Sequence, residues 1–201
     1  MRSIIYNFEY NAPQIDKNEA LRYAGVAKGD VDSEALLDSC IAQAEDKLSY
    51  KGCYARFEVH VSGDEVDIGF ARVNSHSLAI CLDGCFEIVV FCATVGVGID
   101  RLIARYSAIS PSRAIMFQAL GSERVEALCN KFCAEISAEE KIKGGVTRPR
   151  FSPGYGDLSL DVQRSIFSVL EVGKRIGATL NDNLFMSPSK SVTAIIGIKR
   201  N

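Results

Sequence analysis

Apolar and polar positions along this chain repeat with two different periods, which predict strands in some segments and helices in others. In the strand-like segments, apolar residues either alternate with polar ones or form a continuous β-branched run. The segments predicted as strands are residues 3–10, 54–61, 66–70, 87–95 and 191–198. Residues 62–65, Ser-Gly-Asp-Glu, join the second and third of these and favour a β-hairpin. The run 87–95 is apolar almost throughout, so we expect it to be a buried strand.

Apolar residues spaced three and four apart occupy the other ordered segments. The segments predicted as helices are residues 17–23, 34–48, 75–82, 99–106, 111–142 and 161–175. Asp16 and Asp32 are suited to cap the first two, and Ser110 followed by Pro111 is suited to begin the longest. Strands and helices are mixed but do not alternate as regularly as in βαβ units. The pattern therefore predicts an α+β fold with a largely antiparallel twisted sheet and packed helices, in a single domain of residues 1–201.

Composition limits the classes of protein to which the chain can belong. Its 201 residues are 47% hydrophobic, enough to bury a substantial core, and its formal net charge is −2. A protein that binds phosphates of nucleic acid needs a surplus of Lys and Arg, so nucleic acid is not an expected partner. The sequence has no apolar run of membrane-spanning length, and its first residues lack the long apolar region of a secretory signal. We therefore expect a cytoplasmic protein without a membrane partner.

The seven cysteines are an odd number, and most lie inside apolar segments. In a reducing compartment such thiols commonly pack as small core residues, and we expect that role here. Cys81 and Cys85 are four residues apart, as are Cys129 and Cys133, so each pair is predicted on one helix face. A four-thiolate zinc site is the alternative, although zinc sites usually have the tighter Cys-x-x-Cys spacing. We predict no metal ligand.

A Gly-x-Gly turn at Gly96 and Gly98 follows the predicted buried strand. In nucleotide-binding α/β folds, such a turn lets a ligand approach the backbone closely. Arg101 occupies the place of the third glycine of that motif. The two interpretations are a tight strand-to-helix turn and a Rossmann-type cofactor site, and the first is favoured because Gly-x-Gly alone is a weak signal.

The Pro- and Gly-rich segment 147–160 is a stronger candidate for a ligand-binding loop. Its prolines keep the residues before them extended, and Pro153-Gly154 suits the centre of a type II turn, where glycine adopts a positive φ. We expect a kinked strip with exposed backbone N–H and C=O groups. Arg150 could bind a carboxylate through two parallel hydrogen bonds, and Tyr155 offers an apolar ring with a polar end. A rigid surface loop is the alternative.

The long predicted helix carries a stripe of small and apolar residues at spacings of three and four, which we expect to face inward. The stripe consists of Ile115, Ala119, Ser122, Glu126, Cys129 and Cys133. Glu126 is its only acid, and a carboxylate on such a face needs a partner or a ligand cation. The alternative to a ligand is a structural ion pair with an arginine such as Arg124 or Arg148.

Taken together, these segments resemble a known family. Residues 150–157, RFSPGYGD, are similar to the Arg-x-x-Pro-Gly-Tyr motif of the activation domain of cobalamin-dependent methionine synthase. Residues 186–197, MSPSKSVTAIIG, resemble that domain's Met-x-Pro-x-x-Ser-Val segment, and residues 115–128 resemble its long helix. The resemblance covers about the last ninety residues, and the whole chain looks like a short stand-alone member of the family.

The resemblance implies a site for S-adenosylmethionine. The site positions that it assigns here are Glu126, Arg150, Ser152, Gly154 and Tyr155. The ligand's carboxylate suits Arg150, its ammonium and sulfonium charges suit Glu126, and backbone groups of the turn are expected to hold the adenosyl part. Two departures are that Ser152 stands where Ala is common, and that Gly-Asp-Leu follows Tyr155 in place of a Cys-Pro-containing stretch. The family's N-terminal ligand acid has no recognisable counterpart in residues 1–80.

The resemblance also implies an activity in methionine biosynthesis. In the family, cobalamin that has been oxidised to an inactive cobalt(II) state is repaired by one electron and a methyl group from S-adenosylmethionine. The chain is then expected to act as an accessory component on a separate cobalamin-carrying protein, the methionine synthase core or a related corrinoid protein, with a flavodoxin-type reductant as the candidate electron donor.

No catalytic side chain is predicted, because the cobalt and the sulfonium carry the chemistry themselves, and His60 and His76 are expected to be structural. Two alternatives to this function stay open. One is a non-catalytic adaptor for a corrinoid methyltransferase, with ligand binding lost. The other is a conventional S-adenosylmethionine-dependent methyltransferase that uses the turn at Gly96 and Gly98.

Overall fold

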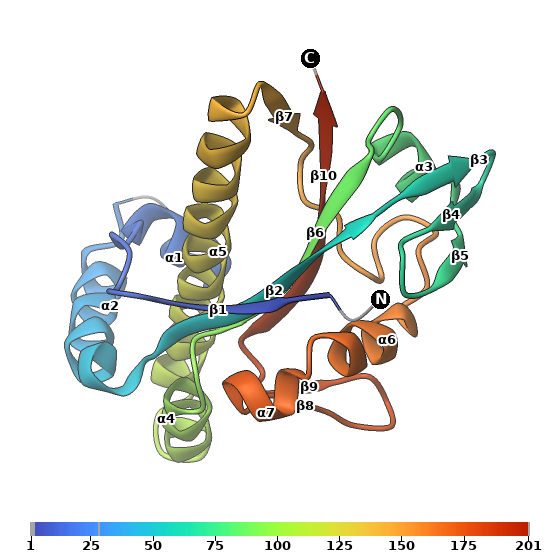
Figure 1. Cartoon of the computed structure of the whole chain (residues 1–201). Coiled ribbons are helices and arrows are strands. Elements are labelled where there is room, and N and C mark those ends of the chain that lie inside the picture. Colours follow the sequence, from blue (N-terminus) through green and yellow to red (C-terminus); the bar gives the residue numbers. More distant parts are fainter. Residues whose placement is uncertain (1–2, 28, 201) are drawn as a thin grey trace.

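A five-stranded sheet forms the centre of the computed structural model, which describes residues 3–27 and 29–200. Its strand order is β1-β2-β6-β10-β7, and every neighbouring pair is antiparallel (Figure 1). The strands are β1 (Ile5–Tyr10), β2 (Tyr50–Glu58), β6 (Glu87–Thr94), β7 (Gly145–Thr147) and β10 (Ser191–Arg200). The predicted α+β fold with an antiparallel sheet is therefore confirmed.

Helices cover both faces of this sheet. The helices on one face are α1 (Lys17–Tyr23), α2 (Val31–Ala44), α4 (Gly98–Tyr106) and α5 (Pro111–Ile142). Those on the other face are α3 (His76–Cys81), α6 (Val162–Val169) and α7 (Val172–Ile176). In Figure 1, α1, α2 and α4 gather around α5, whereas α6 and α7 lie next to each other below the strands. The sheet thus separates two apolar cores.

Strand β6 shows why one segment of the sequence is apolar almost throughout. Val89 and Phe91 belong to the core under α5, whereas Ile88 and Val90 belong to the core under α6. Successive side chains of a strand point to opposite faces, and here both faces are covered. The prediction of a buried strand is confirmed.

Helix α5 begins at Pro111 and ends at Ile142, as predicted. Proline suits the first turn because its missing N–H would have no partner there. Ser110 precedes the helix, but its side chain makes no capping hydrogen bond. The predicted inward stripe is buried at Ala119 and Cys129, whereas Ile115 is exposed. The stripe therefore begins at a residue that faces solvent, contrary to the expectation.

Two smaller sheets complete the secondary structure. Strands β3 (His60–Ser62), β4 (Glu65–Asp67) and β5 (Arg72–Asn74) form one, and β8 (Thr179–Leu180) and β9 (Met186–Ser187) form the other. The predicted hairpin is present, because β3 and β4 pair antiparallel across the turn. A short 3-10 helix, Glu45–Lys47, leads from α2 towards β2.

Several local predictions were wrong. The strand predicted over 66–70 ends at Asp67. Asp30, and not Asp32, caps α2 by accepting a hydrogen bond from the N–H of Ser33. The helix predicted over 161–175 divides into α6 and α7, because Glu171 between them has a φ of 50°. The strand predicted over 54–61 is interrupted before β3, so that its end joins a different sheet.

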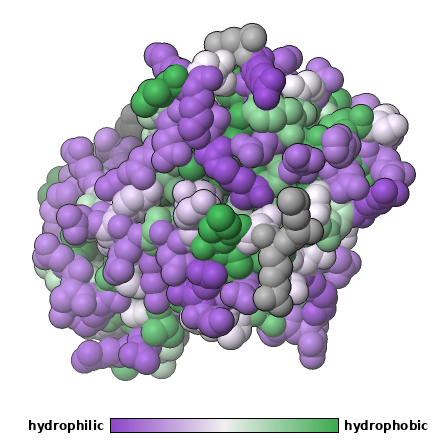
Figure 2. Space-filling view, viewed as in Figure 1, coloured by the Kyte–Doolittle hydropathy of each residue, from purple (hydrophilic) through white to green (hydrophobic). Residues whose placement is uncertain are grey.

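The surface viewed from the same side is mostly hydrophilic. Figure 2 shows hydrophobic residues there as separate patches among polar ones. Of the helices in the described ranges, none is both long enough and apolar enough to span a membrane.

Candidate functional site

Strand β10 is longer than β7, its neighbour at the edge of the sheet, and this difference in length leaves part of the outer edge of β10 uncovered. β7 pairs only with residues 198–200 of β10, and Phe151 forms a single bridge with Ile195. Residues 191–193 pair with β6 on their inner side, but no strand among the described residues covers their outer side. A cavity of about 360 Å³ lies at this uncovered edge. Its size falls within the range of small-molecule sites.

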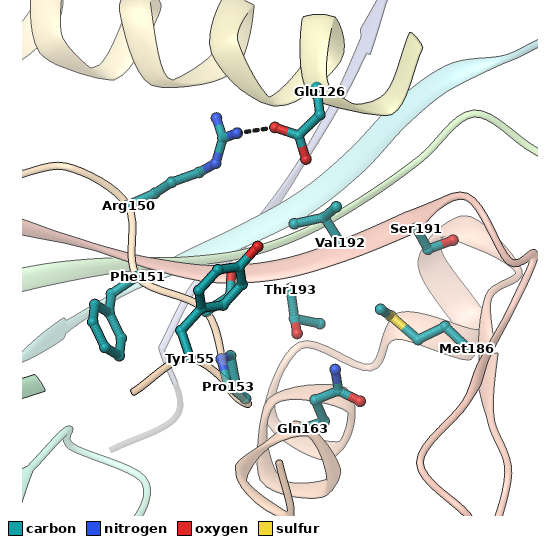
Figure 3. A pocket seen from close by; sticks show the side chains of 11 residues that line it. Glu126, Arg150, Phe151, Pro153, Tyr155, Gln163, Met186, Ser191, Val192 and Thr193 are labelled. Carbon is teal, nitrogen blue, oxygen red and sulfur yellow. Dashed lines mark hydrogen bonds and ion pairs between the residues drawn. The ribbon is translucent and has the colours of Figure 1, made fainter. Parts of the chain in front are cut away.

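The cavity draws its lining from segments that are distant in the sequence (Figure 3). The lining residues are Glu126, Arg150, Phe151, Ser152, Pro153, Tyr155, Gln163, Met186, Ser191, Val192 and Thr193. Four of the five site residues predicted from the sequence, Glu126, Arg150, Ser152 and Tyr155, are therefore brought together. Gly154, the fifth, is not part of the lining, and its contribution is to the turn.

The turn after Phe151 has the predicted geometry. Gly154 has a φ of 89°, and the N–H of Tyr155 donates to the carbonyl of Ser152 at 3.1 Å. A positive φ at the third residue and this hydrogen bond are the marks of a type II turn. The turn orients Ser152 and Tyr155 towards the cavity from either side of Pro153.

The backbone of this turn is less available to a ligand than expected. The N–H of Phe151 donates to the carbonyl of Ile195 at 2.8 Å, and the N–H of Gly154 donates to the carbonyl of Leu158 at 2.9 Å. The N–H of Tyr155 closes the turn itself. The prediction of a strip with freely exposed N–H groups was therefore wrong at three of its residues.

Asp157 fastens the turn to the N-terminus of α3. Its carboxylate accepts hydrogen bonds from Ser75 Oγ at 2.6 Å, from the N–H of His76 at 2.8 Å and from the N–H of Ser77 at 3.1 Å. These bonds, that from Ser75 foremost, hold the pKa of Asp157 below its ordinary range. Gly156 permits the close approach, because a Cβ there would lie 2.6 Å from Ser77 Oγ. The Gly-Asp departure from the family motif thus positions the turn.

Glu126 and Arg150 form an ion pair at one end of the cavity. Arg150 Nη1 also donates to Asn130 Oδ1 at 2.7 Å. Glu126 and Asn130 are one helical turn apart on α5, so a single guanidinium can contact both. The side chains of Arg150 and Glu126 are 23% and 37% exposed, so the pair is within reach of a ligand. Neither Arg124 nor Arg148 pairs with Glu126 in the described part of the chain.

The walls next to this ion pair are largely apolar. Val192 from β10, Pro153 from the turn and Met186 from β9 contribute them. Tyr155 is 69% exposed, and Figure 3 shows its ring between Arg150 and Pro153 at the side of the cavity. A charged end beside an apolar wall suits a ligand that carries both kinds of group.

The opposite end of the cavity carries two buried polar side chains, Gln163 and Thr193, which are 6% and 2% exposed. Within the described residues, Gln163 Oε1 and Thr193 Oγ1 are two of the four buried side-chain polar atoms that lack a hydrogen-bond partner. Sequence reasoning missed both. The available signals were a threonine inside the apolar last strand, and a glutamine on the buried face of a helix beside Val162 and Ile166.

The Gly-x-Gly turn lies outside this cavity and has a packing role. Gly96 has a φ of 81°, and a Cβ at Gly98 would collide with the carbonyl oxygen of Lys47. Strand β6, which leads into the turn, is antiparallel to both of its neighbours. A Rossmann-type site needs a parallel sheet, so the geometry favours the tight-turn interpretation.

The cysteines show no sign of a shared metal site. Burial raises the pKa of the thiols of Cys92 and Cys129, which keeps them protonated as packing groups. Cys129 and Cys133 lie on one face of α5, but Cys85 lies beyond the end of α3, contrary to the predicted pairing with Cys81 on one helix. The described residues contain no group of three or more His, Cys, Asp or Glu side chains that could hold a metal ion.

Comparison with known proteins relates this arrangement to a family. The family model of the vitamin B12-dependent methionine synthase activation domain matches residues 84–201, more than half of the chain. A search of curated sequences found no significant match. The crystal structure of the MetH reactivation domain bound to AdoHcy is similar over 98% of this chain and 78% of that one, with a TM-score of 0.74 and 19% identity. The fold is therefore shared with that domain, and the chain belongs to the activation domain family of vitamin B12-dependent methionine synthase.

Proposed function

We propose that this chain binds S-adenosylmethionine in the cavity beside β10 and supports reductive methylation of oxidised cobalamin on a separate protein. The observation that carries the proposal is the meeting of Glu126 and Arg150, from α5 and from the Pro-Gly segment, at the charged end of that cavity. Family membership supports the link to cobalamin. The similar reactivation domain was crystallised with AdoHcy, which supports the class of ligand.

The charged groups of the cavity suit a sulfonium amino acid. The guanidinium of Arg150 can hold a carboxylate through two parallel hydrogen bonds, and the carboxylate of Glu126 can hold an ammonium group. In the free protein these two side chains neutralise each other. A zwitterionic ligand replaces this ion pair by two, one between Arg150 and the ligand's carboxylate and one between Glu126 and the ligand's ammonium group. Neither protein charge is then left without a partner.

The remaining lining suits the reacting part of the ligand. When bound, S-adenosylmethionine supplies the methyl group on a sulfonium sulfur, which is also the leaving group. Val192 and Met186 give this region an apolar wall. Tyr155, exposed at the side of the cavity, lies where a cobalamin-carrying partner could approach. The chain's task is to hold and orient the ligand, and this role needs no proton-transferring residue.

The proposed partner is the methionine synthase core or a related corrinoid protein, with a flavodoxin-type reductant as the proposed electron donor. The functional test mixes an oxidised cobalamin protein with a one-electron reductant and S-adenosylmethionine, with and without this chain. The loss of cobalt(II) absorbance is followed by spectroscopy. We expect recovery only when the chain and S-adenosylmethionine are both present. Equal recovery without the chain would contradict the proposal.

Ligand binding is tested separately by calorimetry with S-adenosylmethionine and S-adenosylhomocysteine. We expect binding to the wild type and a large loss in Arg150→Ala, with Arg72→Ala in the small β3-β4-β5 sheet as the matched control. No heat with the wild type would favour the adaptor alternative. Binding that depends on Gly98 and not on Arg150 would favour a conventional methyltransferase.

A further inference from the structure

We infer that Gln163 and Thr193 form an uncharged subsite of the cavity, which binds the polar groups of a nucleoside. The inference rests on the proposed function, because it assigns the part of the proposed ligand that these two residues contact. It concerns side chains that neither the sequence motifs nor the comparisons single out.

The first argument is the unpaired state of both side chains. Buried polar groups in folded proteins nearly always have a hydrogen-bond partner, and an unpaired one destabilises the fold. Gln163 Oε1 and Thr193 Oγ1 have none among the described residues, although each side chain is more than nine-tenths buried. They come from α6 and β10, and both line the same cavity. Figure 3 shows both side chains in the lower part of the view, with the amide nitrogen of Gln163 on the side of Thr193 and its amide oxygen directed away from Thr193.

The second argument concerns charge. The ionised groups of the cavity, Glu126 and Arg150, lie together at its other end. Near Gln163 the lining offers an amide, hydroxyls and apolar groups, so a charged ligand group there would lack a counter-charge. Ser191 is already satisfied, since its Oγ hydrogen-bonds to Thr94 Oγ1 and to the carbonyl of Pro188. A neutral group with both donors and acceptors fits this end.

The third argument is the open edge of β10. Ile195 exchanges two backbone hydrogen bonds with Phe151, so its N–H and C=O point to the outer side of the strand. Because this orientation repeats every two residues, the N–H and C=O of Thr193 also point outward, where no described strand pairs with them. Thr193 therefore lines the cavity with a buried hydroxyl, and its backbone N–H and C=O point to the open outer side of the strand.

These groups match the hydrogen-bonding pattern of a nucleoside. A glutamine amide can form two parallel hydrogen bonds with the edge of an adenine, and a threonine hydroxyl both donates and accepts. The N–H groups of Gly154 and Tyr155, which were expected to serve the adenosyl part, are bonded within the protein. The nucleoside is thus assigned to the end with Gln163 and Thr193, and the amino acid to the end with Glu126 and Arg150.

The experiment uses two variants that keep shape but remove polar atoms, Thr193→Val and Gln163→Met. Affinities for S-adenosylmethionine are measured by calorimetry, and those for 5′-methylthioadenosine, which lacks the amino acid part, by ligand-observed NMR. We expect each variant to weaken both ligands by about tenfold, the effect of one lost hydrogen bond to a buried group. Arg150→Ala is expected to weaken S-adenosylmethionine and to leave 5′-methylthioadenosine unchanged. Matched controls are Thr179→Val and Gln118→Met, which alter side chains outside the cavity.

A second readout separates ligand binding from a structural role. Because both variants remove an unpaired buried polar atom, the melting temperature of the ligand-free protein should stay equal or rise. A lower melting temperature together with unchanged affinity would overturn the inference. Failure of the wild type to bind S-adenosylmethionine would instead overturn the proposed function. If the wild type binds S-adenosylmethionine but not 5′-methylthioadenosine, or if both variants bind like the wild type, the subsite alone is wrong.

Discussion

Replacement of Arg150 by alanine should have a small effect on the fold and a large effect on the ligand. The Arg150 and Glu126 side chains are 23% and 37% exposed, and ion pairs of this kind contribute about 0–1 kcal/mol. The hydrogen bond to Asn130 adds about 0.5 kcal/mol, because Asn130 is exposed. We therefore expect the free energy of unfolding to fall by about 1 kcal/mol. For a chain of this size, that lowers the melting temperature by about 2–4 °C.

The predicted effect on affinity is much larger. Two charge-assisted hydrogen bonds to the ligand carboxylate contribute about 1.5 kcal/mol each at the low end, which suits a site at a partly exposed rim. Their loss corresponds to an increase of about 100-fold in Kd. Arg150→Lys keeps the charge but loses the planar fork, so its Kd should lie between those of the wild type and the alanine variant.

Calorimetry and thermal unfolding of the same samples check both halves of this prediction. The reasoning would be refuted if Arg150→Ala changed the Kd for S-adenosylmethionine by less than about threefold. It would also be refuted if the melting temperature fell by more than about 8 °C, because Arg150 would then be a structural residue.

Three further predictions concern residues outside the cavity lining. Arg124→Met leaves the carboxylate of Glu123, which is 4% exposed, without its guanidinium partner. We expect the free energy of unfolding, measured with urea, to fall by about 3–5 kcal/mol, and a second substitution, Glu123→Gln, to recover part of that loss. The hydrogen bond with Asp64 raises the pKa of His76 above its ordinary 6.5, so Asp64→Asn should lower that pKa in an NMR titration. The corresponding stabilisation is complete below about pH 6.5 and disappears as the pH rises through the raised pKa. Asp157→Ala should release the turn from α3, with faster amide exchange in the turn and weaker binding of S-adenosylmethionine, whereas unchanged exchange would contradict its positioning role.

Much of the secondary structure could be predicted because its causes are local. The apolar run of β6, the proline at the start of α5 and the Pro153-Gly154 turn each depend on dihedral preferences or spacing within a few residues. The errors arose where distant contacts decide. Glu171 adopts a positive φ between two helices that both pack on the sheet, although the sequence there continues a helical pattern.

For the site, the sequence by itself determined which chemical groups are present: an acid on a mostly apolar helix face, an arginine and a tyrosine beside a Pro-Gly turn, and the motifs of a known family. Only the tertiary structure decided that Arg150 pairs with Glu126, that the turn's N–H groups are consumed internally, and that Gln163 and Thr193 are buried without partners. The physical reason is that hydrogen bonding and burial are properties of neighbours in space. Here those neighbours meet because β7 is too short to cover the outer edge of β10, and a strand's length relative to its partner is set by the packing of the whole sheet.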